Sequence, residues 1–281
     1  MRTEHTFQLG QNININRMGY GSMQLTGPGV WGDTSRRELA IRVLQIAVEL
    51  GINFFDTADS YGPNTNEVLL QEALSPYYSD LIIATKGGFE RTGPNQWVIN
   101  GRPEHIAKAI EGSLLRLKKD TIDLWQLHRV DTAVPLEDTL EPVAKAVQQG
   151  KIKHVGLSEV SIADIKRAQE IVPVVSVQNL YNIGERKWED VLDYTADHKI
   201  AFIPWYPLAS GPDSFKDKIG PIAARHNATL AQIAIAWLLK RSDNILLIPG
   251  THSPEHLKEN VQGADIVLSK EEFDAIAGLG Q

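Results

Sequence analysis

Four side chains could together transfer a proton to an oxygen atom: Asp56, Tyr61, Lys86 and His128. An unperturbed tyrosine has a pKa of about 10, so it is a poor acid at neutral pH unless a neighbour stabilises the phenolate. A lysine ammonium within about 4 Å would do so, and Asp56 would hold that ammonium in place. His128 could orient a carbonyl oxygen between its ring and the phenol. Such a set protonates an oxygen while another group attacks the carbon.

Each of the four lies at, or shortly after, the end of a strand-like run. Residues 52–55 are mainly apolar (Ile-Asn-Phe-Phe) and lead into Asp56, and the next loop carries Tyr61. Residues 81–86 end at the lysine, and residues 122–128 end at the histidine. Runs that are apolar on successive residues suit parallel α/β sheets, where functional groups gather at the carboxyl ends of strands. Each residue alone is also explained as a turn former, a solvated cation or a core histidine, but their shared position favours a site.

Strand-like and helical patterns alternate along the chain. Strands are predicted to begin near residues 17, 52, 81, 122, 154, 174, 200 and 245. Most precede a helical pattern, which is the period of a (β/α)8 TIM barrel. A doubly wound open sheet is the alternative, but residues 19–24 lack the third glycine of the dinucleotide fingerprint and lead into a loop. We therefore predict an α/β protein with one barrel domain over residues 1–281.

Helical spacing predicts helices over residues 35–50, 66–74, 103–117, 136–149, 161–171, 188–198 and 229–239. Ser35 and Glu38 match a capping box at the start of the first helix, and Gly150 suits the end of the fourth. Residues 6–15 alternate apolar and polar around a Gly-Gln-Asn turn, which predicts an N-terminal β-hairpin. Residues 87–100 are expected to form a loop.

The composition limits the classes of function. Formal net charge is −7, from 28 basic and 35 acidic residues, so the average field repels nucleic acids and anionic membranes. The absence of cysteine excludes disulfides, thiolate nucleophiles and cysteine-ligated metals. No apolar signal core follows Met1, and no uncharged apolar run approaches the roughly 20 residues of a membrane helix. We expect a cytoplasmic monomer that binds neither nucleic acid nor membranes.

Three motifs carry a family resemblance: residues 51–62 (GINFFDTADSYG), 84–86 (ATK) and 123–128 (DLWQLH). The chain resembles the aldo-keto reductases, which are NAD(P)H-dependent carbonyl reductases on a (β/α)8 barrel. The likeness extends through residues 156–158, 177–182, 204–208 and 248–260. It implies that Tyr61 is the proton donor and that His128 orients the carbonyl. Lys86 and Asp56 would modulate Tyr61.

The resemblance also implies a nicotinamide cofactor, NADPH in preference to NADH. Ser158 and Gln178 match residues that bind the carboxamide, and Trp205 matches the aromatic residue that stacks on the nicotinamide. Residues 249–260 match the phosphate and adenine site, and Pro254 suits the first position of a helix whose free N–H groups would face a phosphate. The expected cofactor contacts are Gly21, Ser22, Met23, Asp56, Ser158, Gln178, Trp205, Pro207, Leu208, Ser210, Pro249, Gly250, Thr251, Ser253, His256, Glu259 and Asn260.

Three positions depart from the family pattern. Glu159 stands where many relatives have an asparagine against the carboxamide. Gly250 stands where many have a lysine beside the 2′-phosphate, and His256 where many have an arginine. These departures weaken the expected preference for NADPH over NADH. Other cations could compensate: Lys216, Lys218, Arg241 and Lys258.

Large apolar side chains are expected to wall the mouth of the barrel. The expected contacts with a small-molecule carbonyl substrate are Met23, Trp31, Phe89, Trp97, His128 and Arg129. Such walls suit a planar aromatic aldehyde better than a small charged keto acid. Residues 9–32 are similar to bacterial members of the family that include pyridoxal reductases, so pyridoxal is the candidate substrate.

Other functions are compatible with parts of the sequence. A Schiff-base lyase would use Lys86 as its nucleophile, but it would leave the Tyr61 loop and residues 249–260 unexplained. Some members of the family are non-enzymatic subunits that sense nicotinamide redox state, and the intact set of four gives that role no preference. The histidines at 252 and 256 match an H-x-x-E-H pattern, but Pro254 between them suits the start of a helix, so no metal site is expected.

Overall fold

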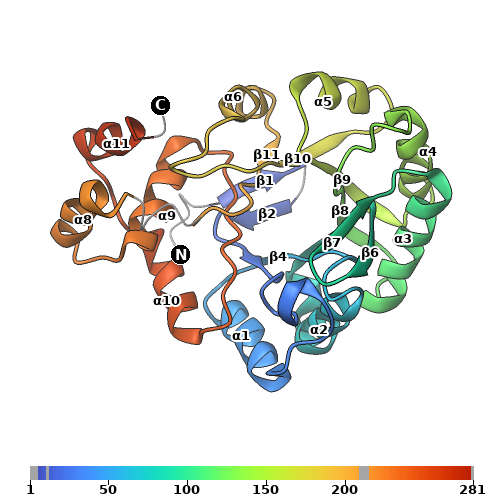
Figure 1. Ribbon diagram of the computed structural model, residues 1–281, viewed down its shortest axis with the longest axis horizontal. Coiled ribbons are helices and arrows are strands. Elements are labelled where there is room, and N and C mark those ends of the chain that lie inside the picture. The colour runs from blue at the N-terminus through green and yellow to red at the C-terminus, as the bar shows by residue number, and fades with distance from the viewer. Residues whose placement is uncertain (1–5, 11–12, 209–214, 280–281) are drawn as a thin grey trace.

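The computed structural model describes residues 6–10, 13–208 and 215–279. At its centre a parallel sheet curls into a barrel with helices around it (Figure 1). In pairing order the strands are β11 (Ala201–Phe202), β10 (Val174–Gln178), β9 (Ile152–Ser158), β8 (Ile122–Leu127), β5 (Ile82–Gly87), β4 (Phe54–Asp56) and β3 (Tyr20–Gly21). Every neighbouring pair in this order is parallel, as strands joined through helices must be.

Residues 245–247 complete the barrel between its two outer strands. Ile245 forms a parallel bridge with Phe202, and Leu247 forms one with Met18. Backbone hydrogen bonds of 2.7 and 2.8 Å flank the second bridge. The eighth strand is therefore present as two single bridges, and the prediction of an α/β barrel of eight strands is confirmed.

The predicted helices are present, each within two residues of its expected ends. They are α1 (Arg37–Glu49), α2 (Thr65–Leu74), α3 (Pro103–Leu117), α4 (Leu136–Gln148), α5 (Ile162–Gln169), α6 (Glu189–Asp197) and α9 (Leu230–Arg241). Pro254 begins α10 (Pro254–Gly263) as predicted. The sequence did not predict α8 (Lys216–Arg225), α11 (Lys270–Ala277) or the 3₁₀ turns η2 (Pro28–Val30) and η3 (Ser75–Asp80). Within the described residues, no helix is long and apolar enough to cross a membrane.

The start of α1 differs from the prediction. The helix begins at Arg37, and no side chain caps it, so the capping box expected at Ser35 is wrong. The Asp33 carboxylate pairs with the Arg37 guanidinium at 2.5 Å, and the Thr34 hydroxyl accepts from the Arg36 amide at 3.2 Å. Residues 33 and 34 therefore stabilise this turn in place of Ser35.

The sequence suggested a simple loop for residues 87–100, but the structure differs. They contain an antiparallel hairpin of β6 (Phe89–Gly93) and β7 (Gln96–Ile99). Asn95 in the turn has a φ of 55°, a conformation that asparagine tolerates well. The hairpin gives Phe89 and Trp97 a regular support beside the mouth of the barrel.

The predicted N-terminal hairpin is confirmed. β1 (Thr6–Leu9) pairs antiparallel with β2 (Ile13–Asn16), while residues 11–12 of its turn lie outside the described residues. Leu9 and Ile15 are completely buried and pack with Phe54, Leu124 and Leu246 of the barrel interior. The hairpin thus seals the end of the barrel at which the strands begin, and the other end is left for a site.

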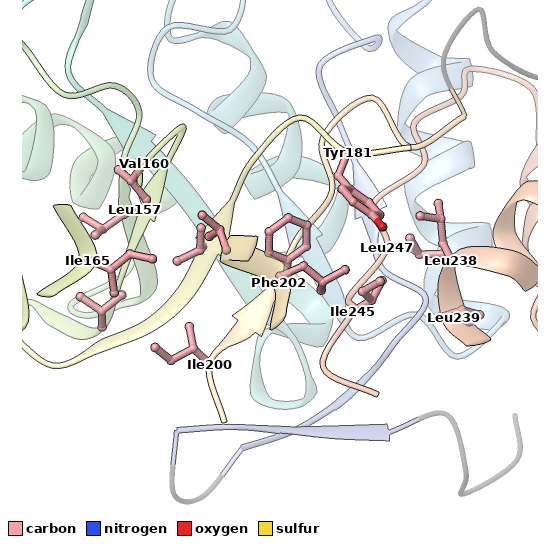
Figure 2. Packing of buried hydrophobic residues seen from close by; sticks show 14 of the residues in the cluster. Leu157, Val160, Ile165, Tyr181, Ile200, Phe202, Leu238, Leu239, Ile245 and Leu247 are labelled. Atoms are coloured by element: carbon pink, nitrogen blue, oxygen red, sulfur yellow. The ribbon is translucent and has the colours of Figure 1, made fainter. Parts of the chain in front are cut away.

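A second apolar layer joins the sheet to its helices (Figure 2). Leu157 and Phe202 project from strands, Ile165 and Leu238 from helices, and all four are completely buried. Burying a side chain of this kind stabilises the fold by about 1.5–3 kcal/mol. This layer holds the strands whose carboxyl ends carry the polar residues described next.

Candidate active site

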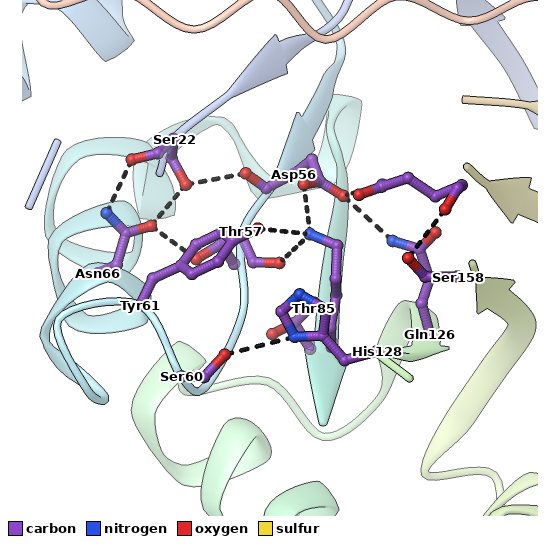
Figure 3. Close-up of polar contacts among 12 residues, drawn as sticks. Ser22, Asp56, Thr57, Ser60, Tyr61, Asn66, Thr85, Gln126, His128 and Ser158 are labelled. Carbon is purple, nitrogen blue, oxygen red and sulfur yellow. Dashed lines mark hydrogen bonds and ion pairs between the residues drawn. The ribbon is translucent and has the colours of Figure 1, made fainter. Parts of the chain in front are cut away.

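Asp56, Tyr61 and His128 converge near the carboxyl ends of β4 and β8 (Figure 3). Lys86, at the carboxyl end of β5, contacts both Asp56 and Tyr61. The buried Lys86 ammonium donates to Asp56 Oδ1 at 2.5 Å, to the Thr57 carbonyl at 2.9 Å and to the Tyr61 phenol at 3.3 Å. These bonds use all three donors of an ammonium. The Tyr61 and His128 rings meet edge to face, with centroids 5.9 Å apart. The four residues singled out in the sequence therefore share one place.

The Asp56 carboxylate is surrounded by donors. Its Oδ2 accepts from the side-chain amides of Gln126 at 3.1 Å and Gln178 at 3.0 Å, while Oδ1 accepts from Lys86. A buried carboxylate is costly unless it is paired and hydrogen-bonded, so these donors hold it in one orientation. The Ser22 hydroxyl lies 2.8 Å from the Asp56 carbonyl oxygen, so Ser22 supports the backbone of this strand end.

The groups around the phenol act in opposite directions. Burial raises the pKa of Tyr61; the Lys86 ammonium opposes that rise and the Asp56 carboxylate adds to it. Burial would lower the pKa of Lys86, but Asp56 and then Tyr61 more than offset this, so the Lys86 pKa lies above its ordinary value. Lys86 therefore stays charged, and Tyr61 keeps its proton at neutral pH until a stronger base, such as an alkoxide, forms beside it.

His128 is neutral in this setting. Burial, and then the nearby cations Lys86, Arg129 and Arg91, hold the pKa of His128 well below its ordinary value. The Ser60 hydroxyl lies 3.3 Å from Nδ1 of the ring. A neutral imidazole has one donor nitrogen and one acceptor, and the partner of one nitrogen sets the role of the other. In the tautomer in which the Ser60 hydroxyl donates to Nδ1, Nε2 carries the proton and can donate to an oxygen atom.

A pocket of about 510 Å³ opens over these residues. The predicted site residues in its lining are Gly21, Met23, Asp56, Tyr61, Phe89, Trp97, His128, Arg129, Ser158, Gln178, Trp205, Pro207, Leu208, Pro249 and Gly250. Lys86 lies beneath it, while Trp31 lies outside the lining, 5.7 Å from the Arg91 guanidinium. Ser210 is outside the described residues.

Sequence reasoning missed three residues of the lining: Gln24, Tyr206 and Ile248. Each is the direct chain neighbour of a residue that was predicted, so the signal was present at the adjacent position. It also missed Gln126, whose amide binds Asp56 from β8 at 3.1 Å. Gln126 stands two residues before His128, on the same face of the strand, and that spacing could have identified it.

The Trp205 ring is held by Glu159. Oε1 of Glu159 accepts from the Trp205 indole N–H at 2.7 Å and from the Leu180 amide at 2.6 Å. Glu159 has a φ of 56°, a backbone conformation that asparagine adopts more readily than glutamate. Its carboxylate thus supports the indole, while the Arg129 guanidinium donates to the Ser158 hydroxyl at 3.0 Å.

The sequence model described as the aldo/keto reductase family matches residues 17–281. The chain belongs to the aldo/keto reductase family. It is 49% identical over 272 residues to an uncharacterized oxidoreductase of Schizosaccharomyces pombe, which covers 95% of this chain and 87% of that protein. It is 40% identical over 285 residues to pyridoxine 4-dehydrogenase of Escherichia coli, 99% of each chain.

A crystal structure of an aldo/keto reductase from Klebsiella pneumoniae in complex with NADP and acetate has the same fold. The TM-score is 0.81 at 25% identity, over 98% of this chain and 95% of that one. The family expected from the motifs is thereby confirmed, and this chain is an oxidoreductase of that family.

In this aldo/keto reductase, Gly250 permits a close approach between two segments of the pocket. A Cβ at position 250 would lie 2.5 Å from the Gly21 carbonyl oxygen, and a Cβ at Gly21 would lie 2.6 Å from the Ile248 carbonyl oxygen. Real Cβ atoms do not come so close to a backbone atom. A side chain at position 250 would therefore push β3 and residues 248–250 apart.

The segment after Gly250 forms the start of α10. The Thr251 hydroxyl accepts from the Ser253 amide at 3.1 Å, and the Ser253 hydroxyl caps the helix by accepting from the His256 amide at 3.2 Å. Because Pro254 is the first helical residue, His252 lies outside the helix that carries His256. Nowhere in residues 6–10, 13–208 and 215–279 do three histidine, aspartate or glutamate side chains gather as a metal ion would require.

The cations suggested as substitutes for the missing lysine are in different situations. Arg241 is paired with Glu189 at 2.6 Å and with Asp193 at 2.7 Å, so its charge is engaged on α6. Lys216 and Lys218 are exposed on α8. The remaining members of the predicted adenine end, Glu259 and Asn260, follow on α10, where Asn260 is buried.

Proposed function

We propose that this aldo/keto reductase reduces an aldehyde or ketone to an alcohol with NADPH, and that Tyr61 donates the proton. One observation carries the proposal: the Lys86 ammonium donates to both Asp56 and Tyr61 beneath the pocket. A phenol in that position has a built-in stabiliser for the charge that forms when its proton leaves.

The residues around the pocket fit a nicotinamide dinucleotide. Ser158 and Gln178 offer a hydroxyl and an amide at the inner end, where Trp205 offers a flat ring. The N-terminus of α10, with the hydroxyls of Thr251 and Ser253, suits a phosphate group. The NADP complex of the Klebsiella pneumoniae relative supports NADPH in particular. When bound, the cofactor supplies a hydride to the carbonyl carbon.

The chain's own residues would act on the carbonyl oxygen. The Tyr61 hydroxyl and Nε2–H of neutral His128 both donate to it, so the developing negative charge meets two donors. The Tyr61 proton then passes to the oxygen, and the O–H bond of the alcohol forms as that of the phenol breaks. Lys86, 3.3 Å from the phenol oxygen, stabilises the resulting phenolate, and Asp56 holds Lys86 in place.

The mouth of the pocket favours a planar aromatic aldehyde. Ring centroids of Phe89 and His128 lie 4.7 Å apart, and Trp97 lies 5.3 Å from Phe89 and 6.4 Å from Tyr61. These rings make apolar walls that fit a flat ring better than a short, charged molecule. The relative named pyridoxine 4-dehydrogenase supports pyridoxal as the leading candidate.

The decisive test is Tyr61→Phe, which removes the proton and keeps the ring. We expect kcat to fall by at least about a hundredfold, because the donor acts only in the transition state, while the Kd for NADPH stays within about twofold. Steady-state kinetics and fluorescence titration measure the two quantities. A rate within tenfold of wild type would exclude Tyr61 as the donor.

The cofactor and the substrate class need separate measurements. We expect tryptophan fluorescence to be quenched at lower concentrations of NADPH than of NADH; equal affinity would mean that Gly250 has removed recognition of the 2′-phosphate. We expect kcat/KM for pyridoxal and benzaldehydes to exceed that for short aliphatic aldehydes and keto acids. The proposal of pyridoxal fails if aliphatic aldehydes are the better substrates.

A Schiff-base lyase has less support. All three N–H donors of Lys86 are engaged, and its raised pKa keeps it protonated, whereas a Schiff base needs the free amine. Borohydride treatment with carbonyl compounds, followed by mass spectrometry, should leave Lys86 unmodified.

A further inference from the structure

Arg91 lies on β6 beside the mouth of the pocket, and its guanidinium donates only to backbone carbonyls among the hydrogen bonds of the described residues. The five acceptors are the carbonyls of Gly29 (3.0 Å), Val30 (2.9 Å), Ser60 (2.7 Å), Gly93 (3.3 Å) and Gln96 (2.9 Å). A guanidinium has five N–H donors in a rigid fork, so every donor is used. No carboxylate within the described part of the chain forms an ion pair with it.

The five carbonyls belong to three separate segments. These are residues 27–32, the loop that follows β4, and the β6–β7 hairpin itself. The segments also bind one another directly: the Asn95 amide donates to Gly29 at 2.9 Å, and the Gly62 amide donates to Val30 at 3.2 Å. The carbonyls of Gly29 and Val30 thus each accept from Arg91 and from a second loop. Arg91 sits at the junction of the three.

The same guanidinium fixes an aromatic wall. It lies 3.7 Å from the centre of the Trp97 ring and 5.7 Å from that of Trp31. Trp97 lines the pocket, and its ring centre is 6.4 Å from that of Tyr61 and 6.3 Å from that of His128. Stacking of a cation on the ring face sets the plane of Trp97 against these two rings.

Ser60 connects Arg91 to the groups that would act on the substrate. Its carbonyl accepts from Arg91 at 2.7 Å, its hydroxyl lies 3.3 Å from Nδ1 of His128, and Tyr61 follows it in the chain. A shift of the Ser60 backbone would therefore move the Tyr61 donor and alter the hydrogen bond that orients His128. A displacement of about 1 Å in a catalytic group can cost about a hundredfold in rate.

We propose that Arg91 is a positioning residue that fixes the Ser60–Tyr61 backbone and the Trp97 ring in the relative positions that catalysis needs. This inference rests on the carbonyl reduction proposed above, and it adds a residue that touches neither substrate nor cofactor. It predicts that loss of the guanidinium fork loosens all three segments together and slows the chemical step.

The test is Arg91→Lys, which keeps the positive charge but cannot span three segments. Arg186→Lys is the matched control, because Arg186 also donates to two carbonyls, those of Ile276 and Ala277, and lies 4.5 Å from the Trp237 ring, outside the pocket lining. Hydrogen exchange of peptides covering residues 28–32, 60–64 and 94–97 reports on the segments without any turnover. We expect exchange at least about tenfold faster in Arg91→Lys and unchanged at these peptides in Arg186→Lys.

Kinetics provide the second readout. With a benzaldehyde as substrate, Arg91→Lys should lower kcat at least about tenfold while the Kd for NADPH stays within about twofold of wild type. Unchanged exchange in the three peptides would overturn the inference even where the enzyme reduces carbonyls, and so would an equal loss of kcat in Arg186→Lys.

A milder variant covers the case in which Arg91→Lys does not fold. Trp31→Ala removes the second ring beside the guanidinium, and we expect faster exchange in the same three peptides together with a fall in kcat of about threefold. If both the exchange of these peptides and kcat stayed as in wild type, the inference would be overturned. A wild-type protein that reduces no carbonyl would refute the proposed function, while the exchange comparison would still decide whether Arg91 holds the segments.

Discussion

Two ion pairs, each with a buried carboxylate, lie on opposite sides of strand β5. Lys86 points into the barrel and pairs with Asp56 at 2.5 Å. The preceding residue, Thr85, points outward; its hydroxyl donates to Glu67 Oε1 at 2.5 Å, and the other oxygen of Glu67 accepts from Arg116 at 2.6 Å. Successive residues of a strand face opposite sides, so neighbouring positions serve two separate networks.

The two pairs are similar in distance, and each buries its carboxylate, but Lys86 is completely buried whereas the Arg116 side chain is 22% exposed. The two cations also reach different further groups. Arg116 joins α3 to Glu67 on α2, and it also donates to the Ser113 hydroxyl of its own helix. Lys86 has a third bond, to the Tyr61 phenol, which lines the pocket. A short ion pair to a buried carboxylate is thus no sign of catalysis by itself. What distinguishes the inner pair is that the third N–H of Lys86 reaches a phenol in the pocket.

Breaking the inner pair should have the largest effect on activity. We expect Lys86→Met to lower kcat by about a thousandfold, because the Tyr61 phenolate loses its stabilising charge, while NADPH still binds. Steady-state kinetics and fluorescence titration on the folded variant check both statements. A rate within tenfold of wild type would make the inner pair structural, like the outer one.

Breaking the outer pair should affect stability and leave the chemistry alone. Arg116→Met leaves Glu67 buried and unpaired, so we expect the free energy of unfolding to fall by about 3 kcal/mol, with kcat per folded molecule unchanged. Urea unfolding and kinetics below the transition measure the two. As a control, Arg42→Met breaks the exposed pair with Glu49 and should cost less than about 1 kcal/mol. A large loss of kcat in Arg116→Met would remove the distinction between the two faces.

Asp59, in the loop between the two networks, should make the outer face sensitive to pH. Burial, and then the Glu67 charge, raise the pKa of Asp59 to about 8. Because the folded state keeps a proton that the unfolded chain releases above pH 4, this contribution to stability is complete at low pH and is lost as pH rises toward 8. Asp59→Asn carries no such proton. We expect the free energy of unfolding of Asp59→Asn, relative to that of wild type, to rise by about 2 kcal/mol from pH 6 to pH 7.5. Urea unfolding at each pH measures this difference. If the difference in free energy of unfolding between the two proteins did not change with pH, Asp59 would not have a raised pKa in the folded state.

Ser60, the next residue, faces the inner network, and its substitution should have the smallest effect. Ser60→Ala removes the hydroxyl beside Nδ1 of His128, so the tautomer with a proton on Nε2 loses its bias. We expect kcat to fall by about two- to tenfold, the worth of one hydrogen bond, with little change in stability. Ser60→Thr, which keeps the hydroxyl, should retain most of the rate. Equal rates in Ser60→Ala and wild type would show that the hydroxyl does not orient the imidazole.

The fold and the inner network around Asp56 and Lys86 could largely be predicted from the sequence, for a physical reason. Asp56, Lys86 and His128 end apolar runs, and the carboxyl ends of barrel strands converge whatever lies between them. The Glu67–Arg116 pair gave no such signal, because its two residues lie on different helices, 49 positions apart. Their side chains are common on exposed helix faces, so only the packing of α2 against α3 singles them out.

The contacts of Arg91 could not be predicted at all. Its acceptors are backbone carbonyls, which every residue has, so the sequence does not mark Gly29 or Ser60 as partners. The α8 helix was missed because Pro221 interrupts its pattern, and the β6–β7 hairpin because its strands are short and mixed in polarity. Sequence patterns therefore locate groups at element ends, and backbone acceptors in loops become visible only in three dimensions.

Residues 245–250 have a consequence for the order in which the enzyme becomes active during synthesis. They supply the bridges that close the sheet, and Ile248, Pro249 and Gly250 line the pocket against Gly21. A growing chain on the ribosome therefore contains Asp56, Tyr61, Lys86 and His128 long before it can enclose a cofactor. Between the synthesis of His128 and that of residues 245–250, the nascent protein has its chemical groups but an open pocket. The pocket closes only when this late segment pairs beside Met18.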